Sequence, residues 1–271
     1  MSGELFELEI LGGSTERRFR KLRPEVEAMP WGTMGVEGIS PGELIAARSA
    51  WTGAAYQEHR TGVACAITLR ALIEARAPLD LIAVASRFPL DEMVHVELCA
   101  RMAMELGGGT EIIHDPNAMV LDVDPSLSPL MRAAECAVRF FFVGEAISIP
   151  LLRATWHVSK HPLPKAVMGR IVKDEAAHGT FGFTFLDWAL PRLTPEDLDR
   201  QQARQIGILR EGLTALAPGG VLVYSTCSLE KEENEDVVRA VCGDSAIPMH
   251  YRIPGRDPGD GFFAAVIHKP A

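Results

Sequence analysis

The five cysteines of this 271-residue chain contain no Cys-x-x-Cys pair, and an odd count cannot close completely into disulfides. A disulfide framework is therefore disfavoured, and a reduced cytoplasmic compartment is expected. The N-terminus also lacks a basic patch followed by an apolar run, so no signal peptide is expected. The longest apolar stretch, residues 140–152, is interrupted by Glu145 and Pro150 and is too short to span a bilayer. We therefore expect no membrane partner.

An excess of basic residues is missing as well. Lysine and arginine number 27 against 36 aspartates and glutamates, which gives a formal net charge of −9. A protein that binds a phosphate backbone is expected to carry a basic face, so nucleic acid is not predicted as a partner. With 47% hydrophobic residues, the chain can bury one large core or two small ones.

The sequence does contain two copies of Glu-x-x-His, and each follows a lone glutamate about thirty residues upstream. A four-helix bundle can place one Glu from each of two helices, and a Glu-x-x-His from each of the other two, around one point in its core. Positions i and i+3 share a helix face, so each motif can bind a metal from one helix. The candidate metal ligands are Glu58, Glu92, His95, Glu145, Glu175 and His178.

Four helices are predicted around these residues. They begin at Ser40-Pro41, where a serine cap precedes a proline, and then run over about 79–106, 128–158 and 164–190. All six candidate ligands fall on the apolar stripe of their helix. An isolated buried carboxylate needs a counter-charge, and a metal ion supplies it more simply than the few basic residues on the same faces. Buried salt bridges remain the structural alternative.

Residues 40–192 thus resemble the ferritin-like superfamily of di-iron carboxylate proteins. The resemblance implies a dinuclear site with two Fe ions, Mn being the other choice, in which Glu92 and Glu175 bridge the metals. It also implies reaction with O2 or peroxide. The main prediction is an oxidase or oxygenase of a small molecule, that is, a non-haem di-iron oxidoreductase. An electron-donor protein is the partner that this class implies. The alternatives within the superfamily are a ferroxidase that takes Fe(II), and a metal-stabilised scaffold without turnover.

Four residues beside the motifs carry further expectations. Pro89 and Pro150 either kink their helices and widen a substrate pocket, or merely start and bend them. Glu97 and Asp174 lie off the apolar stripes and are expected to face solvent. For Asp174, a contact with a histidine ligand is the alternative.

The last quarter of the chain has a different pattern. A helix over 201–216 precedes a β run at 221–225, an acidic helix over 230–241 and an apolar strand at 261–267. The segments PGGVLVYSTCSLEKEENE and DGFFAAVIHK resemble the C-terminal end of the RNA cytosine-5 methyltransferases. The resemblance implies that Cys227 is the nucleophile that attacks the pyrimidine ring, a step suited to a thiolate.

That resemblance is partial. Residues 1–195 contain neither a glycine-rich turn after a strand nor a Pro-Cys motif, so S-adenosylmethionine is not expected as a cofactor, and methyltransfer is the less favoured alternative. The predicted fold is mainly α: an irregular lead-in (1–39), a ferritin-like four-helix bundle (40–192) and a small C-terminal α/β appendage (196–271). An exposed sheet edge in the appendage favours a homodimer.

Overall fold

The computed structural model describes residues 4–119, 122–243, 246–258 and 261–270. The chain divides into two compact units, Met1–Arg192 (unit 1) and Leu193–Ala271 (unit 2). Unit 1 is helical, whereas unit 2 combines two helices with a three-stranded sheet. The coarse prediction of a mainly helical protein with a small sheet near its C-terminus is confirmed.

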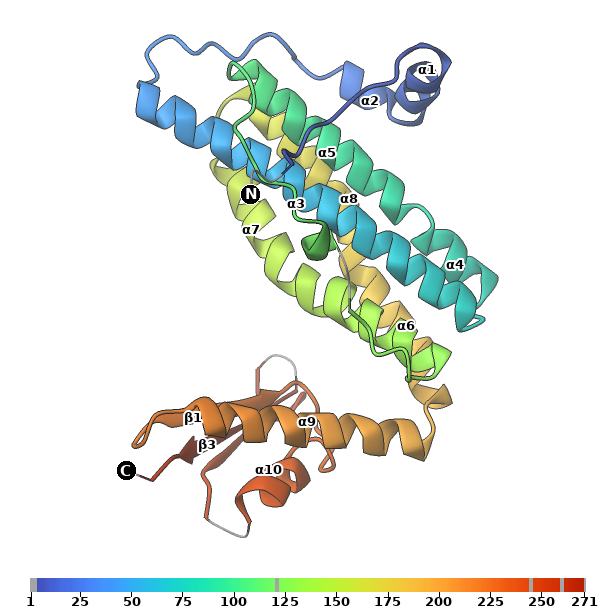
Figure 1. Ribbon diagram of the computed structural model, residues 1–271, viewed down its shortest axis with the longest axis vertical. Coiled ribbons are helices and arrows are strands. Elements are labelled where there is room, and N and C mark those ends of the chain that lie inside the picture. Colours follow the sequence, from blue (N-terminus) through green and yellow to red (C-terminus); the bar gives the residue numbers. More distant parts are fainter. Residues whose placement is uncertain (1–3, 120–121, 244–245, 259–260, 271) are drawn as a thin grey trace. The chain divides into compact units, whose positions relative to one another are not determined.

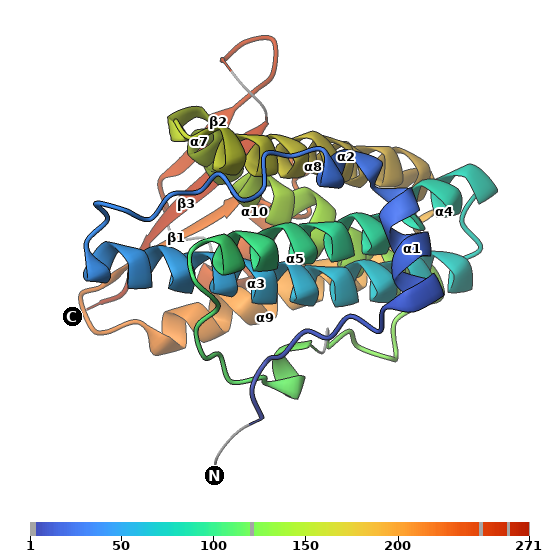
Figure 2. The same ribbon diagram turned by 90° about the horizontal axis from the view of Figure 1, so that it is seen from above.

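Long helices that run alongside one another build unit 1 (Figures 1 and 2). Helix α3 packs on α5 and α6, and helix α8 packs on α7, α6 and α5. The elements of unit 1 are α1 (Gly13–Leu22), α2 (Pro24–Glu27), α3 (Pro41–Glu74), α4 (Leu79–Ala85), α5 (Phe88–Glu105), the 3-10 turn η1 (Pro116–Met119), α6 (Pro129–Ala137), the π-helical segment η2 (Val138–Gly144), α7 (Glu145–Val158), α8 (Pro162–Ala189) and the 3-10 turn η3 (Leu190–Arg192).

Helix α3 begins where the sequence predicts. Ser40 Oγ accepts a hydrogen bond from the backbone N–H of Glu43 at 3.3 Å, and the Glu43 carboxylate accepts one from the Ser40 N–H at 3.1 Å. This reciprocal capping box satisfies two backbone donors that a helix N-terminus otherwise leaves free, and Pro41 has no such donor to satisfy. The start of the first long helix is therefore confirmed.

Two of the predicted helices are not continuous. The helix predicted over 79–106 is divided into α4 and α5, and Pro89 lies in the first turn of α5. Pro89 therefore starts a helix, as the alternative prediction held, and does not kink one. The third predicted helix contains the π-helical segment η2, which ends directly before Glu145, while Pro150 lies inside α7.

The lead-in was predicted to be irregular, but it contains the helices α1 and α2. Arg23, between these helices, is almost fully buried and donates hydrogen bonds to the carboxylates of Glu27 and Glu97, the latter at 2.6 Å. Glu97 is therefore a half-buried partner of Arg23, and the expectation that it faces solvent is wrong. These charge-assisted hydrogen bonds connect the lead-in to α5.

Two apolar clusters form the core of unit 1. One contains Phe88 from the start of α5 and Phe185 from α8, and the other contains Leu98 from further along α5 and Ile171 from α8. The candidate ligands of α5 lie in sequence between Phe88 of the first cluster and Leu98 of the second. The polar site is consequently enclosed by apolar packing at both ends.

Unit 2 contains α9 (Pro195–Ala215), β1 (Val221–Thr226), α10 (Glu235–Cys242), β2 (Met249–Arg252) and β3 (Phe262–His268). The strand order is β1-β3-β2, and both pairings are antiparallel. Alternate residues of β3, among them Phe263 and Ala265, pack with Leu209 of α9 and Val237 of α10. The sequence predicts β1 and β3 but not β2, and α10 begins five residues later than predicted.

Within the residues that the structure describes, no helix is both long enough and apolar enough to cross a membrane.

Candidate functional site

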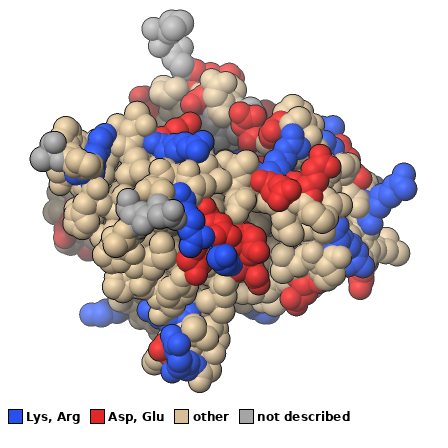
Figure 3. Space-filling view, turned by 90° about the horizontal axis from the view of Figure 1, so that it is seen from below, with Lys and Arg blue, Asp and Glu red and all other residues tan. Residues whose placement is uncertain are grey.

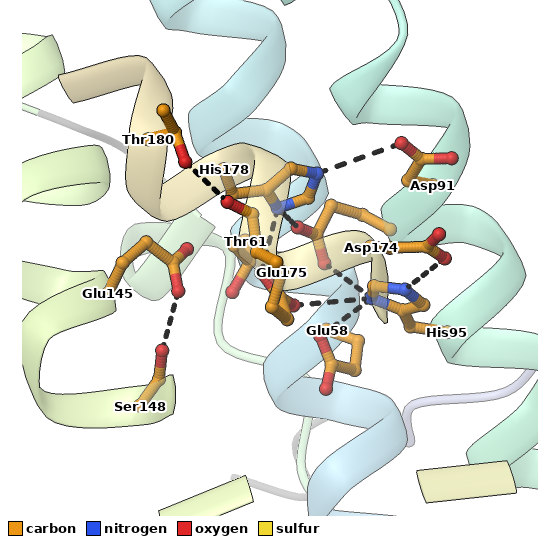
Figure 4. Close-up of polar contacts among 12 residues, drawn as sticks. Glu58, Thr61, Asp91, His95, Glu145, Ser148, Asp174, Glu175, His178 and Thr180 are labelled. Atoms are coloured by element: carbon orange, nitrogen blue, oxygen red, sulfur yellow. Dashed lines mark hydrogen bonds and ion pairs between the residues drawn. The ribbon is translucent and has the colours of Figure 1, made fainter. Parts of the chain in front are cut away.

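The six predicted ligands come together in the interior of unit 1. Glu58 comes from α3, Glu92 and His95 from α5, Glu145 from the first turn of α7, and Glu175 and His178 from α8; Figure 4 labels all of these except Glu92. Their ligand atoms form two groups, within each of which all atoms lie within 4.8 Å of one another. The first group is Glu58, Glu92, His95 and Glu175, and the second is Glu145, Glu175 and His178.

Glu92 and Glu175 lie between the two histidines. The Nδ1 atom of His95 is 3.5 Å from Glu92 Oε2 and 3.4 Å from Glu175 Oε1. The Nδ1 atom of His178 is 3.2 Å from Glu92 Oε1 and 2.8 Å from Glu175 Oε2. Each of these carboxylates therefore presents one oxygen to each imidazole.

The outer nitrogen of each histidine faces an aspartate of the other helix. His95 Nε2 on α5 is 3.0 Å from Asp174 Oδ2 on α8, and His178 Nε2 on α8 is 3.7 Å from Asp91 Oδ2 on α5. Such carboxylate contacts fix the orientation of an imidazole and its tautomer. They leave both Nδ1 atoms directed toward the glutamates.

Arginines complete this second layer. Arg170 forms an ion pair with Asp174, and Arg87 lies 3.2 Å from Asp91, each arginine one helical turn before its aspartate. The expectation that Asp174 faces solvent is wrong, because Asp174 is buried and contacts His95, as the alternative held. The sequence signal for the whole arrangement is a repeated Arg-x-x-x-Asp-Glu-x-x-His, at 87–95 and 170–178.

The inward-facing atoms lack hydrogen bonds. Among the described residues, neither oxygen of Glu92 and neither Nδ1 atom of His95 and His178 has a hydrogen-bond partner, although all are buried. A buried polar group without a partner is costly, and a buried charge more so. The same atoms are the ones that a bound cation would contact.

The carboxyl groups have pKa values that differ widely across the site. Burial raises the pKa of Glu58 to about 7 and that of Glu145 to about 8. Burial also opposes ionisation of Glu175, but its contacts with the imidazoles of His178 and His95 lower its pKa to about 2. For His178, burial disfavours the cation, yet Asp91, Glu175 and Glu92 raise the pKa to about 11. The site therefore favours positive charge at its centre.

Aromatic rings close the site beside His178. The ring of Phe88 lies 4.4 Å from the His178 ring, centroid to centroid, and Phe141 lies 6.1 Å away. On the neighbouring helix, Glu145 accepts a hydrogen bond from Ser148 Oγ at 2.6 Å. Buried carboxylate and imidazole ligands suit a divalent metal ion. Metal binding by the six residues nevertheless stays a prediction.

Unit 2 presents the other candidate residue, Cys227, in the turn after β1. The thiol is exposed, and the turn around it is held by Asn234, whose side chain is fully buried. Asn234 Oδ1 accepts a hydrogen bond from Thr226 Oγ1 at 2.5 Å, and its Nδ2 donates to the Ser228 carbonyl at 3.0 Å. The residue pattern around Cys227 does not predict this role of Asn234. One amide thus fixes the residues on both sides of Cys227.

Comparisons with known proteins concern the C-terminal region. Residues 190–247 match the family model described as 16S rRNA methyltransferase RsmB/F. Ribosomal RNA small subunit methyltransferase B of Thermus thermophilus is 40% identical over 79 residues, which cover 29% of this chain and 20% of the relative. The mitochondrial tRNA (cytosine(34)-C(5))-methyltransferase of Mus musculus is 54% identical over 37 residues, 14% of this chain and 11% of the relative. Ribosomal RNA small subunit methyltransferase F of Aeromonas salmonicida is 38% identical over 73 residues, 27% and 13% of the two chains.

The chain therefore spans about a fifth, or less, of the length of these curated relatives. No solved structure matches. The resemblance of the C-terminal region to RNA cytosine-5 methyltransferases is confirmed, whereas the ferritin-like di-iron resemblance finds no support in the comparisons.

These matches contradict the main functional prediction. They point to a methyltransferase, so the di-iron oxidase or oxygenase is wrong as the predicted function, and the RNA cytosine-5 methyltransferase alternative fits better. The predicted Fe or Mn cofactor, O2 or peroxide, the small-molecule substrate, Fe(II) and the electron-donor protein lose their basis with it. The ligand pattern fixes which side chains converge, but it does not specify a reaction.

The same matches contradict two further expectations, that S-adenosylmethionine is not a cofactor and that nucleic acid is not a partner. RsmB/F methyltransferases use S-adenosylmethionine, which was not expected here. The named relatives act on ribosomal and transfer RNA, so the exclusion of nucleic acid on net charge alone was wrong. Net charge averages over the whole surface and does not exclude a local basic face.

Proposed function

We propose that this chain acts in RNA cytosine-5 methylation, with unit 2 as a methyltransferase-type module that presents Cys227 to the pyrimidine ring. The observation that carries the proposal is the match of residues 190–247 to the RsmB/F family, because this segment contains the turn after β1 with Cys227. An exposed thiol on a turn held by a buried amide can approach a base without rearrangement of the strand.

S-adenosylmethionine does not fit the described residues of unit 2. In doubly wound proteins such a cofactor lies in a crevice at the carboxyl ends of parallel strands, where the strand order reverses. Both strand pairings described in unit 2 are antiparallel, so these strands form no such crevice. In this proposal the cofactor site lies outside the described residues of unit 2, and unit 2 supplies the cysteine turn and the sheet that holds it.

Fragment complementation tests the proposal. The full chain is mixed with an RsmB-type methyltransferase from which the segment equivalent to 193–271 has been deleted, with unmethylated 16S rRNA and tritium-labelled S-adenosylmethionine. Label should enter the RNA only when both proteins are present. Cys227→Ser should abolish incorporation, and Cys242→Ser, a matched thiol in the same unit, should retain it.

Absence of label in the mixture would overturn the proposal, provided that the undeleted methyltransferase labels the same RNA. Equal labelling by the Cys227→Ser protein would also overturn the role of this cysteine. Because the readout is tritium in RNA, adventitious binding of the two proteins does not count as success.

A second function, metal binding by unit 1, is favoured by the convergence of four carboxylates and two imidazoles, among which both oxygens of Glu92 and both Nδ1 atoms lack hydrogen bonds. We propose that these residues hold a pair of divalent metal ions, one for each group, with Glu175 shared. The ferritin-like arrangement of four helices is the finer form of this proposal. The metals would supply the counter-charge that stabilises the buried carboxylates, and no reaction is assigned to them.

Metal content measured by plasma mass spectrometry tests this second function. Protein purified without a chelating tag should contain about two divalent ions per chain, a stoichiometry that follows from two ligand groups. Glu92→Ala should lose them, and Glu111→Ala, an exposed glutamate outside the site, should not. Metal at background level in the unsubstituted chain after anaerobic loading with divalent ions would contradict the proposal.

A further inference from the structure

Helix α1 presents three cationic side chains that nothing in the site uses. Arg17, Arg18 and Lys21 are exposed, and none of them forms an ion pair with a residue that the structure describes. Arg17 and Lys21 are one helical turn apart, and Arg18 lies about 100° from Arg17 around the helix axis. The three charges therefore share one outer face, defined here as the α1 basic face.

The opposite side of α1 is fixed to unit 1. Phe19 packs against the apolar cluster that contains Val26 and Leu98, and the Arg23 guanidinium lies 4.8 Å from the centre of the Phe19 ring. The one acidic residue of the helix, Glu16, is paired with Arg20 at 2.7 Å. No carboxylate of the helix is thus left to neutralise the basic face.

This concentration of charge is unusual for the chain as a whole. Helix α1 contains four cations and one carboxylate, on a protein with a net charge of −9. On the face shown in Figure 3, by contrast, lysine and arginine side chains lie among aspartates and glutamates. A local cluster of one sign attracts polyanions even when the total charge is negative.

The cysteine turn of unit 2 is followed by a mostly acidic segment. The residues that follow Cys227 include Glu230, Glu232, Glu233 and Glu235, and these carboxylates repel a phosphate backbone. Lys231 is the one cation among residues 228–236, so cations outside this segment favour RNA binding, and the α1 basic face offers three.

We propose that the α1 basic face, Arg17, Arg18 and Lys21, binds the phosphate backbone of RNA. The inference rests on the proposed function, because that function makes RNA the polyanion concerned. An anionic membrane surface also displays phosphates, but an interfacial helix binds it by burying its apolar face. In α1, Phe19 packs against the core of unit 1, and Leu22 is the one apolar side chain of the helix that is largely exposed, which is too little to insert into a membrane.

Fluorescence anisotropy with a labelled 16S rRNA hairpin tests the proposal on the full chain. Arg17→Gln/Arg18→Gln/Lys21→Gln should bind at least about tenfold more weakly than the unsubstituted chain at about 100 mM salt. The slope of log affinity against log salt should become shallower by about two to three, because a variant that has lost three phosphate contacts releases fewer counterions when it binds. Arg153→Gln/Lys160→Gln/Lys165→Gln removes the same charge elsewhere and should leave both quantities unchanged.

The proposal is overturned if the α1 triple variant binds the hairpin like the unsubstituted chain, or if the unsubstituted chain does not bind it. It is also overturned if vesicles of phosphatidylserine and phosphatidylcholine, and not RNA, require the three residues. RNA binding through α1 without label in the complementation assay would contradict the proposed function alone, whereas label without dependence on α1 would contradict only this inference.

Discussion

The carboxylate of Asp174 on α8 contacts the imidazole of His95 on α5, with Oδ2 and Nε2 3.0 Å apart. The reciprocal pair, Asp91 and His178, is longer at 3.7 Å. Each aspartate thus orients the histidine of the other helix. The pairing couples the two helices that carry the Glu-x-x-His motifs, and it directs both Nδ1 atoms toward Glu92 and Glu175.

Asp174→Asn should therefore weaken divalent metal binding to unit 1 by about 10- to 100-fold, because the amide no longer fixes the His95 tautomer or raises its basicity. Asp91→Asn should have a smaller effect, since its contact with His178 is longer. Competition with a chromogenic chelator measures both affinities. Asp187→Asn, an exposed substitution on the same helix as Asp174, is the control. Equal affinities in all three variants would rule out an orienting role for Asp174.

The convergence of the six ligands could be predicted because it depends on local geometry. A spacing of three residues places Glu92 with His95, and Glu175 with His178, on one helix face whatever surrounds them. The second layer could not be predicted in the same way. Asp174 lies about 100° from Glu175 on the helix, and whether it faces water or a histidine depends on how α5 approaches α8.

Other differences have the same tertiary origin. The π-helical turns of η2 have no signature in the side-chain pattern of 138–144, and their backbone at Phe141 and Phe142 lies against Gly182 of α8. Strand β2 is short and pairs only with β3, so its pattern alone is weak. The reaction was mispredicted for another reason, since a ligand set defines a metal site and leaves its chemistry open.

Gly182 permits the close approach of α8 to η2. A Cβ atom at this position would lie 2.8 Å from the carbonyl oxygen of Phe141 and 3.1 Å from the backbone nitrogen of Phe142. Backbone cannot rotate away as a side chain can, so Gly182→Ala should reduce the free energy of unfolding of unit 1 by about 1–3 kcal/mol. Urea unfolding followed by tryptophan fluorescence reports on unit 1 alone, because all four tryptophans lie in it.

Gly53 is the matched control for that substitution. It lies within α3, and a Cβ atom there would meet nothing within 4 Å. Gly53→Ala should therefore stabilise unit 1 by about 0.5–1 kcal/mol, because alanine loses less backbone entropy in a helix. Equal effects of the two substitutions would show that Gly182 is not needed for the contact with η2.

The five thiols should differ sharply in reactivity. Cys65, Cys99 and Cys136 are buried, and burial raises their pKa values, that of Cys136 to about 11. Cys227 is exposed, so an aromatic disulfide reagent at about pH 8, close to the usual thiol pKa, should modify it first. Cys227→Ser should remove the fast phase, and Cys242→Ser should not. Fast modification of a third thiol in the folded protein would contradict the burial in unit 1.

The pair of Arg23 and Glu27 should make unit 1 sensitive to acid. A hydrogen bond from the buried Arg23 guanidinium lowers the pKa of the Glu27 carboxyl below its ordinary value of 4.5. A lowered folded-state pKa contributes stability that is present above that ordinary value and is lost as the pH falls toward the folded-state pKa. Glu97, the other partner of Arg23, has the opposite trend, because burial raises its pKa.

In the Glu27→Gln variant, the free energy of unfolding should therefore fall less steeply below about pH 4.5 than in the unsubstituted chain, as measured by urea unfolding with tryptophan fluorescence. Glu111→Gln, outside this network, should retain the slope of the unsubstituted chain, and an unchanged slope in Glu27→Gln would assign the acid sensitivity to other carboxylates.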